Sequence, residues 1–84
     1  MRDTLRSPRQ HVLRALLRDM RRRRNLTQSQ VAQRLAKPQS FVAKYERGER
    51  RLSVVEFIDV VRALGPEPTV AIRQLVEAMD RADR

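Results

Sequence analysis

A short stretch after Pro38 carries side chains that suit contact with nucleic-acid bases. A glutamine can donate and accept at adenine N6 and N7, and a lysine can donate to guanine O6 and N7. A serine can serve a base or a phosphate, and an alanine is small enough to meet a thymine methyl group. The stretch contains one of each: Gln39, Ser40, Ala43 and Lys44. The alternative is an ordinary polar helix start, and the surrounding elements decide between the two.

Arginine dominates the charge of the chain. Its 84 residues include 19 Lys and Arg against 10 Asp and Glu, which gives a net charge of +9 and a pI near 11.6. A domain this basic is more typical of a protein that binds a polyanion than of one whose charge only keeps it soluble. Guanidinium groups bind phosphate bidentately, and helix N-termini also suit phosphate. The candidate phosphate contacts around the stretch are Gln28, Lys37, Arg47, Arg50 and Arg51.

The chain lacks the residues that most catalytic and metal-binding sites need. His11 is the only histidine, cysteine is absent, and Gly48 and Gly65 are the only glycines. The chain therefore has no thiol nucleophile, no glycine-rich phosphate loop and no usual set of metal ligands. We expect neither enzymatic activity nor a cofactor nor a metal. No stretch is apolar enough for a signal peptide or a membrane span, and the expected location is the cytoplasm.

Two short helices joined by a tight turn would position the candidate base contacts. Thr27 and Gln30 have the spacing of a capping box at the start of the first helix. Pro38 interrupts the helical pattern, and the second helix is predicted from about Pro38 to Glu46. Gly48 is expected to end that helix in the left-handed conformation. The residues expected to face inward from the second helix are Phe41, Val42 and Tyr45.

This stretch, Thr27 to Gly48, resembles the helix-turn-helix of the phage-repressor and Cro-type family, the XRE-like DNA-binding domains. The matching residues are Thr27 and Gln28, Ala32, Leu35, Gln39 and Ser40, Val42, Tyr45, and Glu46 to Gly48. The resemblance covers roughly residues 13 to 66 and implies an all-α, compact five-helix bundle of the lambda-repressor-like type. Ala36 stands where the family usually has a turn glycine, and a left-handed alanine costs roughly 1 kcal/mol.

The resemblance also implies roles for individual residues. In this family the start of the second motif helix contacts base edges in the major groove of double-stranded DNA. An arginine at the position of Arg21 pairs with the glutamate near the end of that helix, which is Glu46 here. We expect this pair to be partly buried, bidentate and structural. The rest of the arginine run 21–24 is either a solvated helix end or a set of phosphate contacts.

The remaining segments complete one domain. Residues 1–6 are expected to form a flexible arm, and residues 7–66 the helix-turn-helix domain with its motif at 28–47. A first helix begins at Ser7 and Pro8, and a fourth begins at a second capping box, Ser53 and Glu56. Residues 67–84 form a C-terminal helix and a candidate dimerisation element. The residues expected to be buried by the fourth helix are Val54, Phe57, Ile58, Val61 and Leu64.

The fifth helix carries an apolar stripe at helical spacing: Ile72, Leu75, Val76 and Met79. The stripe either completes the core or forms a dimer seam, and we expect the seam because the other four helices supply a core.

The predicted function is a sequence-specific transcriptional regulator, a repressor that acts as a homodimer on a near-palindromic operator. One alternative is an antitoxin or adaptor whose fifth helix binds a partner protein, with DNA binding secondary. Another is nonspecific binding of nucleic acid through arginine alone.

Overall fold

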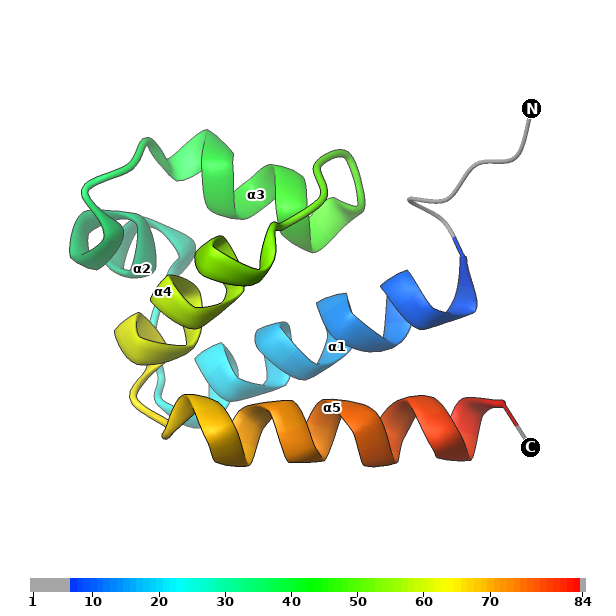
Figure 1. Ribbon diagram of the computed structural model, residues 1–84. Coiled ribbons are helices and arrows are strands. Elements are labelled where there is room, and N and C mark those ends of the chain that lie inside the picture. The colour runs from blue at the N-terminus through cyan, green and yellow to red at the C-terminus, as the bar shows by residue number, and fades with distance from the viewer. Residues whose placement is uncertain (1–6, 84) are drawn as a thin grey trace.

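Five helices and no strand make up residues 7–83, the part of the chain that the computed structural model describes (Figure 1). In chain order they are α1 (Pro8–Arg23), α2 (Gln28–Leu35), α3 (Gln39–Arg47), α4 (Val54–Leu64) and α5 (Pro68–Ala82). The predicted all-α, five-helix fold is confirmed. The expected flexible arm, residues 1–6, lies outside the described residues. Across residues 7–83, no helix has both the length and the apolarity that crossing a membrane requires.

Hydroxyl side chains cap the N-termini of three helices. The Thr27 hydroxyl accepts from the backbone N–H of Gln30 at 3.1 Å, and the Gln30 side chain accepts from the backbone N–H of Thr27 at 2.8 Å. Ser53 and Glu56 form the same reciprocal pair at the start of α4, at 3.1 and 2.9 Å. Ser7 caps α1 through its hydroxyl. Each such cap stabilises its helix by about 1 kcal/mol, and both predicted capping boxes are confirmed.

The turn between α2 and α3 keeps the left-handed geometry without a glycine. Ala36 has φ 56° and ψ 43° and ends α2. An L-residue in this conformation costs about 1–2 kcal/mol, because its Cβ approaches the following carbonyl oxygen. Pro38 is extended, with ψ 152°, so it caps α3 and is not its first residue. The predicted start of this helix was therefore one residue too early.

Gly48 ends α3 in the predicted left-handed conformation, with φ 82°. A second constraint acts on the same position. A Cβ atom here would lie 2.9 Å from the guanidinium carbon of Arg14, which reaches over from α1. The Arg14 guanidinium is the far end of a flexible side chain and can shift, so this second constraint is weak and the positive φ is what requires glycine here.

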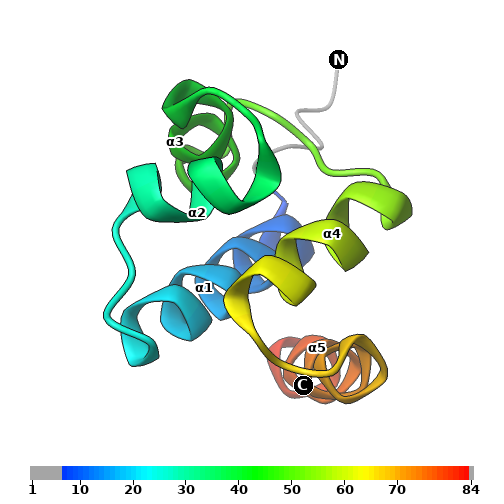
Figure 2. The ribbon, with the colours of Figure 1, turned by 90° about the vertical axis from the view of Figure 1, so that its left-hand side faces the viewer.

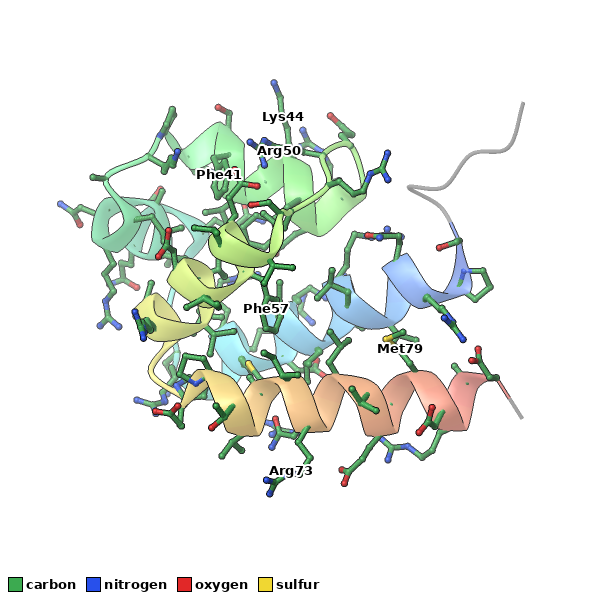
Figure 3. The ribbon with its side chains drawn as sticks, in the orientation of Figure 1. Phe41, Lys44, Arg50, Phe57, Arg73 and Met79 are labelled. Atoms are coloured by element: carbon green, nitrogen blue, oxygen red, sulfur yellow. The ribbon has the colours of Figure 1, made fainter. Side chains whose placement is uncertain are left out.

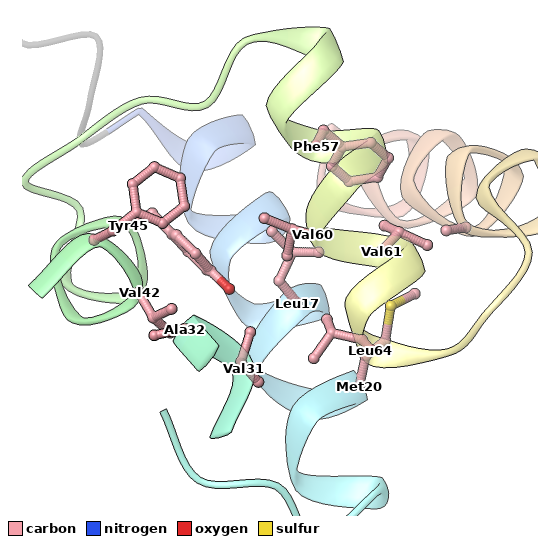
Figure 4. Packing of buried hydrophobic residues seen from close by; sticks show 12 residues of the cluster. Leu17, Met20, Val31, Ala32, Val42, Tyr45, Phe57, Val60, Val61 and Leu64 are labelled. Atoms are coloured by element: carbon pink, nitrogen blue, oxygen red, sulfur yellow. The ribbon is translucent and has the colours of Figure 1, made fainter. Parts of the chain in front are cut away.

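The core gathers side chains from all five helices (Figure 4). Its fully buried large side chains are Tyr45, Leu17, Leu64, Val31, Val42, Val60 and Val61. Within α4, Phe57, Val61 and Leu64 are buried as predicted, and Ile58 is half-buried. Val54 is 71% exposed, and Val60, which was not predicted to be buried, is fully buried. Helical periodicity identified the correct side of α4. It misplaced Val54 because nothing within residues 7–83 covers that side chain at the first turn.

α5 runs antiparallel along α1 and closes the side of the domain opposite α3 (Figures 1 and 2). Ala71 is fully buried, and Leu75 packs against the core. The expectation that the other four helices would supply the core without α5 is therefore wrong. Arg9 and Asp83 form an ion pair of 2.6 Å between the outer ends of the two helices. Because both side chains are exposed, this pair contributes little stability.

The predicted apolar stripe of α5 is split between two directions. Leu75 faces the core, and Met79 is half-buried, with its side chain directed toward α1 in Figure 3. Ile72 and Val76 are 40% and 50% exposed. The four residues lie within about 100° of the helix, at the edge of its buried face. Leu75 and Met79 are therefore partly covered, and of the four Ile72 and Val76 remain available for a partner.

Candidate nucleic-acid interface

α3 presents one polar face to solvent and buries the other. The buried residues are Phe41, Val42, Tyr45 and Glu46. Gln39, Ser40 and Lys44 are exposed and Ala43 is half-buried, so the four predicted base contacts share one surface. Lys44 points away from the body of the domain in Figure 3. A helix held by its apolar face in this way can present the other face to a DNA groove.

Two side-chain hydrogen bonds in series orient Gln39, the first residue of α3. Gln39 Nε2 donates to Gln28 Oε1 at 3.2 Å, and Gln28 Nε2 donates to Glu46 Oε1 at 3.0 Å. Gln39 keeps its own carbonyl oxygen and a second N–H for another partner, the pair of groups that adenine N6 and N7 require. Contact between Gln28 and Gln39 was not predicted, because nothing in their spacing along the chain shows that their side chains meet.

The same carboxylate anchors α1. Arg21 donates from Nε to Glu46 Oε2 at 2.7 Å and from Nη2 to Oε1 at 3.0 Å, the bidentate geometry implied by the family resemblance. Its Nη1 donates to the backbone oxygen of Leu26 at 2.9 Å. The side chains are only 14% and 4% exposed. The hydrogen bond to Glu46 raises the pKa of Arg21. Arg21, Glu46, Gln28 and Gln39 thus form one continuous network.

The cations predicted to contact phosphate differ in whether their side chains already have a partner within residues 7–83. Within residues 7–83, the side chain of Arg51 is exposed and makes no hydrogen bond or ion pair. Lys37 is exposed, and its Nζ lies 5.3 Å from the centre of the Phe41 ring. Arg47 is exposed but pairs with Glu49 at 2.8 Å. An exposed ion pair exchanges easily with another partner, so a phosphate can still compete for Arg47.

Arg50 differs from the other cations. It donates to both carboxylate oxygens of Glu56, at 3.1 and 2.8 Å, and its guanidinium carbon lies 4.6 Å from the centre of the Phe41 ring. The hydrogen bonds from Arg50 lower the pKa of Glu56 to about 2, and those same bonds raise the pKa of Arg50. The assignment of Arg50 as a phosphate contact stays a prediction, and a phosphate would have to compete with Glu56 for a guanidinium group that is already paired inside the fold.

The described residues offer little for metal chemistry. Within residues 7–83, no cluster of three or more His, Cys, Asp or Glu side chains could hold a metal ion. The surface around α3 instead holds ion pairs between elements, Arg21 with Glu46 and Arg50 with Glu56, beside exposed cations such as Lys44. Its exposed groups suit hydrogen bonds and phosphate contacts.

Comparison with known proteins agrees with this geometry. The profile of a family described as "Helix-turn-helix domain" matches residues 12–71 of the chain. Among solved structures, an "XRE-family like protein from Pseudomonas syringae pv. tomato str. DC3000" is similar, with 45% sequence identity and a TM-score of 0.78. That similarity covers 84% of this chain and 85% of the other. No significant match was found among curated proteins.

The fold and the exposed face of α3 define a DNA-binding domain of the helix-turn-helix class. The chain belongs to the helix-turn-helix family, and its form is that of the XRE-like members. The resemblance noted for residues 27–48 is thereby confirmed, and with it the assignment to DNA-binding regulators. This fold is typical of proteins that bind DNA rather than of enzymes.

Proposed function

We propose that the protein is a sequence-specific transcriptional regulator, a repressor that occupies promoter DNA as a homodimer on a near-palindromic operator. The observation that carries this proposal is the exposed polar face of α3. Its first residue, Gln39, is oriented by Gln28 and has hydrogen-bonding groups left over for a base. Ser40, Ala43 and Lys44 extend the same surface by one helical turn.

Phosphate contacts would come from both ends of α3. Lys37 precedes the helix, and Arg47 and Arg51 lie at or beyond its far end. The positive end of α2, at Gln28, adds backbone N–H groups and the helix dipole. These groups would set the register on DNA, whereas the α3 side chains would supply the sequence preference.

Ile72 and Val76 support a dimer. They are one helical turn apart on α5 and are substantially exposed. A single module presents only one short helix to the groove, and two linked modules gain affinity without new types of contact. A two-fold axis through this part of α5 would place two α3 helices on one side of the DNA, about 34 Å apart.

The same exposed pair supports the second candidate, an antitoxin or adaptor. In that case Ile72 and Val76 would contact a different protein, and DNA binding would be secondary. Purification from the native host separates the two candidates. A regulator of the first kind is recovered as a homodimer, and the adaptor is recovered with an unlike chain in constant proportion.

Selection of bound DNA from a random pool tests the proposed function. We expect a consensus of two inverted half-sites, with centres about 10 base pairs apart. A single half-site would contradict the homodimer, and recovery of sequences without any consensus would contradict specific recognition. The selected sequence is called the operator below.

A further inference from the structure

The loop after α3 contains an arginine whose contacts are directed into the fold. Arg50 donates to both carboxylate oxygens of Glu56, at 3.1 and 2.8 Å. Its Nη1 also donates to the backbone oxygen of Arg51, at 2.9 Å. Its guanidinium carbon lies 4.6 Å from the centre of the Phe41 ring, and the two residues lie close together in Figure 3. The surrounding structure therefore determines the orientation of the guanidinium group.

These contacts join three parts of the motif region. Phe41 lies in the first turn of α3, two residues after Gln39, and its ring meets Tyr45 edge-on at 5.6 Å. Glu56 lies in the first turn of α4, where it also accepts from the backbone N–H of Ser53. We call Phe41, Arg50 and Glu56 the α3–α4 clamp. It connects the first turn of α3 to the first turn of α4 through the intervening loop.

We propose that Arg50 is a positioning residue for base recognition and not a phosphate ligand, because the α3–α4 clamp sets how the first turn of α3 enters the groove. This inference rests on the proposed DNA recognition by α3. The Arg50 and Glu56 side chains are 39% and 26% exposed, so the pair is partly shielded from water. A phosphate would have to compete with a bidentate carboxylate, which already uses the paired geometry that makes arginine a strong phosphate ligand.

The two possible roles of Arg50 predict opposite effects for Glu56→Gln. If Arg50 binds phosphate, removing the neighbouring negative charge frees the guanidinium group and strengthens binding to every DNA. If Arg50 acts through the clamp, the substitution releases α3 and weakens operator binding although the protein has become more positive. Electrostatics alone cannot produce that second result.

The experiment compares four single variants with the parent protein. Arg50→Gln and Glu56→Gln each remove one partner of the clamp. Arg50→Lys keeps the charge, and it would satisfy a phosphate ligand but lacks the planar bidentate group that the clamp needs. Arg51→Gln is the matched control, since Arg51 is the adjacent arginine and its side chain has no partner within residues 7–83. Affinity for operator and for random DNA is titrated at several salt concentrations, well below each variant's unfolding temperature.

For the three clamp variants we expect the ratio of operator to random affinity to fall about tenfold. Their salt slopes on operator DNA should stay at the parent value. Arg51→Gln should weaken binding to operator and random DNA alike. It should also make the salt slope shallower by about 0.9, as expected for the loss of one phosphate contact. Circular dichroism at the titration temperature establishes that each variant is folded, and Arg50→Lys supplies the test if the neutral variants unfold.

Two results would overturn the inference. One is an Arg50→Lys variant that binds the operator as the parent does while Glu56→Gln binds it more tightly. The other is an Arg50→Gln variant that behaves like Arg51→Gln. Failure of the proposed function would appear differently, as a parent protein that binds operator and random DNA equally.

Discussion

At the scale of single residues, Glu46 connects the structural and the recognition parts of the domain. Its carboxylate accepts from Arg21 on α1 and from Gln28 on α2, and Gln28 in turn accepts from Gln39. At 4% side-chain exposure, this carboxylate would be costly to leave unpaired. A loss of Arg21 should therefore affect both the stability of the fold and the orientation of Gln39.

The first prediction concerns the Arg21–Glu46 pair. Arg21→Met leaves a buried carboxylate and should lower the free energy of unfolding by about 3 kcal/mol. Glu46→Gln should lower it by a similar amount, because it leaves a buried guanidinium group without its counter-charge. Urea unfolding of both single variants and the double variant measures their coupling. Additive losses would show that the two side chains do not interact.

The second prediction concerns the pH dependence of Glu56. Its folded-state pKa is about 2, below its ordinary value of 4.5, chiefly because of the hydrogen bonds from Arg50. A depressed pKa stabilises the fold above the ordinary value, and this contribution is lost as the pH falls from about 4.5 toward about 2. The parent should exceed Glu56→Gln in unfolding free energy at about pH 7, and the difference should shrink below about pH 4. A difference that stays constant with pH would contradict the assignment.

At the scale of the elements, much of the fold could be predicted from local signals. The capping boxes at Thr27 and Ser53 mark where α2 and α4 begin, and Gly48 marks where α3 ends, because each of these signals acts within a few residues. Periodicity placed Phe41, Val42 and Tyr45 inside. It could not place Val54 or Leu75, since their burial depends on where other helices lie.

The candidate site, like the fold, could be predicted from the sequence only in part. The exposed positions of α3 follow from helical spacing and the family resemblance. The contacts of Arg50 with Glu56 and of Gln28 with Gln39 do not, because they depend on the path of a loop and on the angle between two helices. A net charge alone cannot distinguish an arginine held by a carboxylate from a free one such as Arg51.

The third prediction concerns the turn between α2 and α3. Because Ala36 has a φ of 56°, Ala36→Gly should relieve its steric strain. Glycine is more flexible in the unfolded chain, so the net stabilisation should be about 0.5–1 kcal/mol. As a control, Ala15→Gly in the interior of α1 should destabilise by about 1 kcal/mol. Chemical denaturation compares the two, and a loss of stability in Ala36→Gly would show that the turn does not strain the alanine.

At the scale of the whole molecule, α5 completes the core and also carries the surface on which the proposed homodimer would form. Ala71 and Leu75 serve the first role, and Ile72 and Val76 are placed to serve the second. A charged residue at Leu75 would disturb the core, so its effect would reflect folding and not dimerisation. A test of the dimer therefore has to substitute the exposed residues, Ile72 and Val76. Val70 provides a matched control because it is 43% exposed on the same helix. It lies about 120° around the helix from Val76.

The fourth prediction is that Val76→Glu and Ile72→Glu each give a folded monomer, whereas Val70→Glu remains a dimer. A monomer neutralises half as many phosphates, so the slope of log affinity against log salt should be about half that of the parent. Analytical ultracentrifugation gives the oligomeric state, and DNA titrations in several salt concentrations give the slope. If Val76→Glu and Ile72→Glu sediment as dimers, the two-fold contact lies elsewhere.

The first turn of α3 is proposed to distinguish one DNA sequence from another. The most direct test is the affinity of Gln39→Ala for the operator and for random DNA at one salt concentration, beside the parent. Gln33→Ala, an exposed glutamine of α2, is the control. We predict that Gln39→Ala loses about 1–3 kcal/mol on the operator, with little change on random DNA. An equal loss on both DNAs would contradict the claim, because Gln39 would then contribute to affinity without reading the sequence.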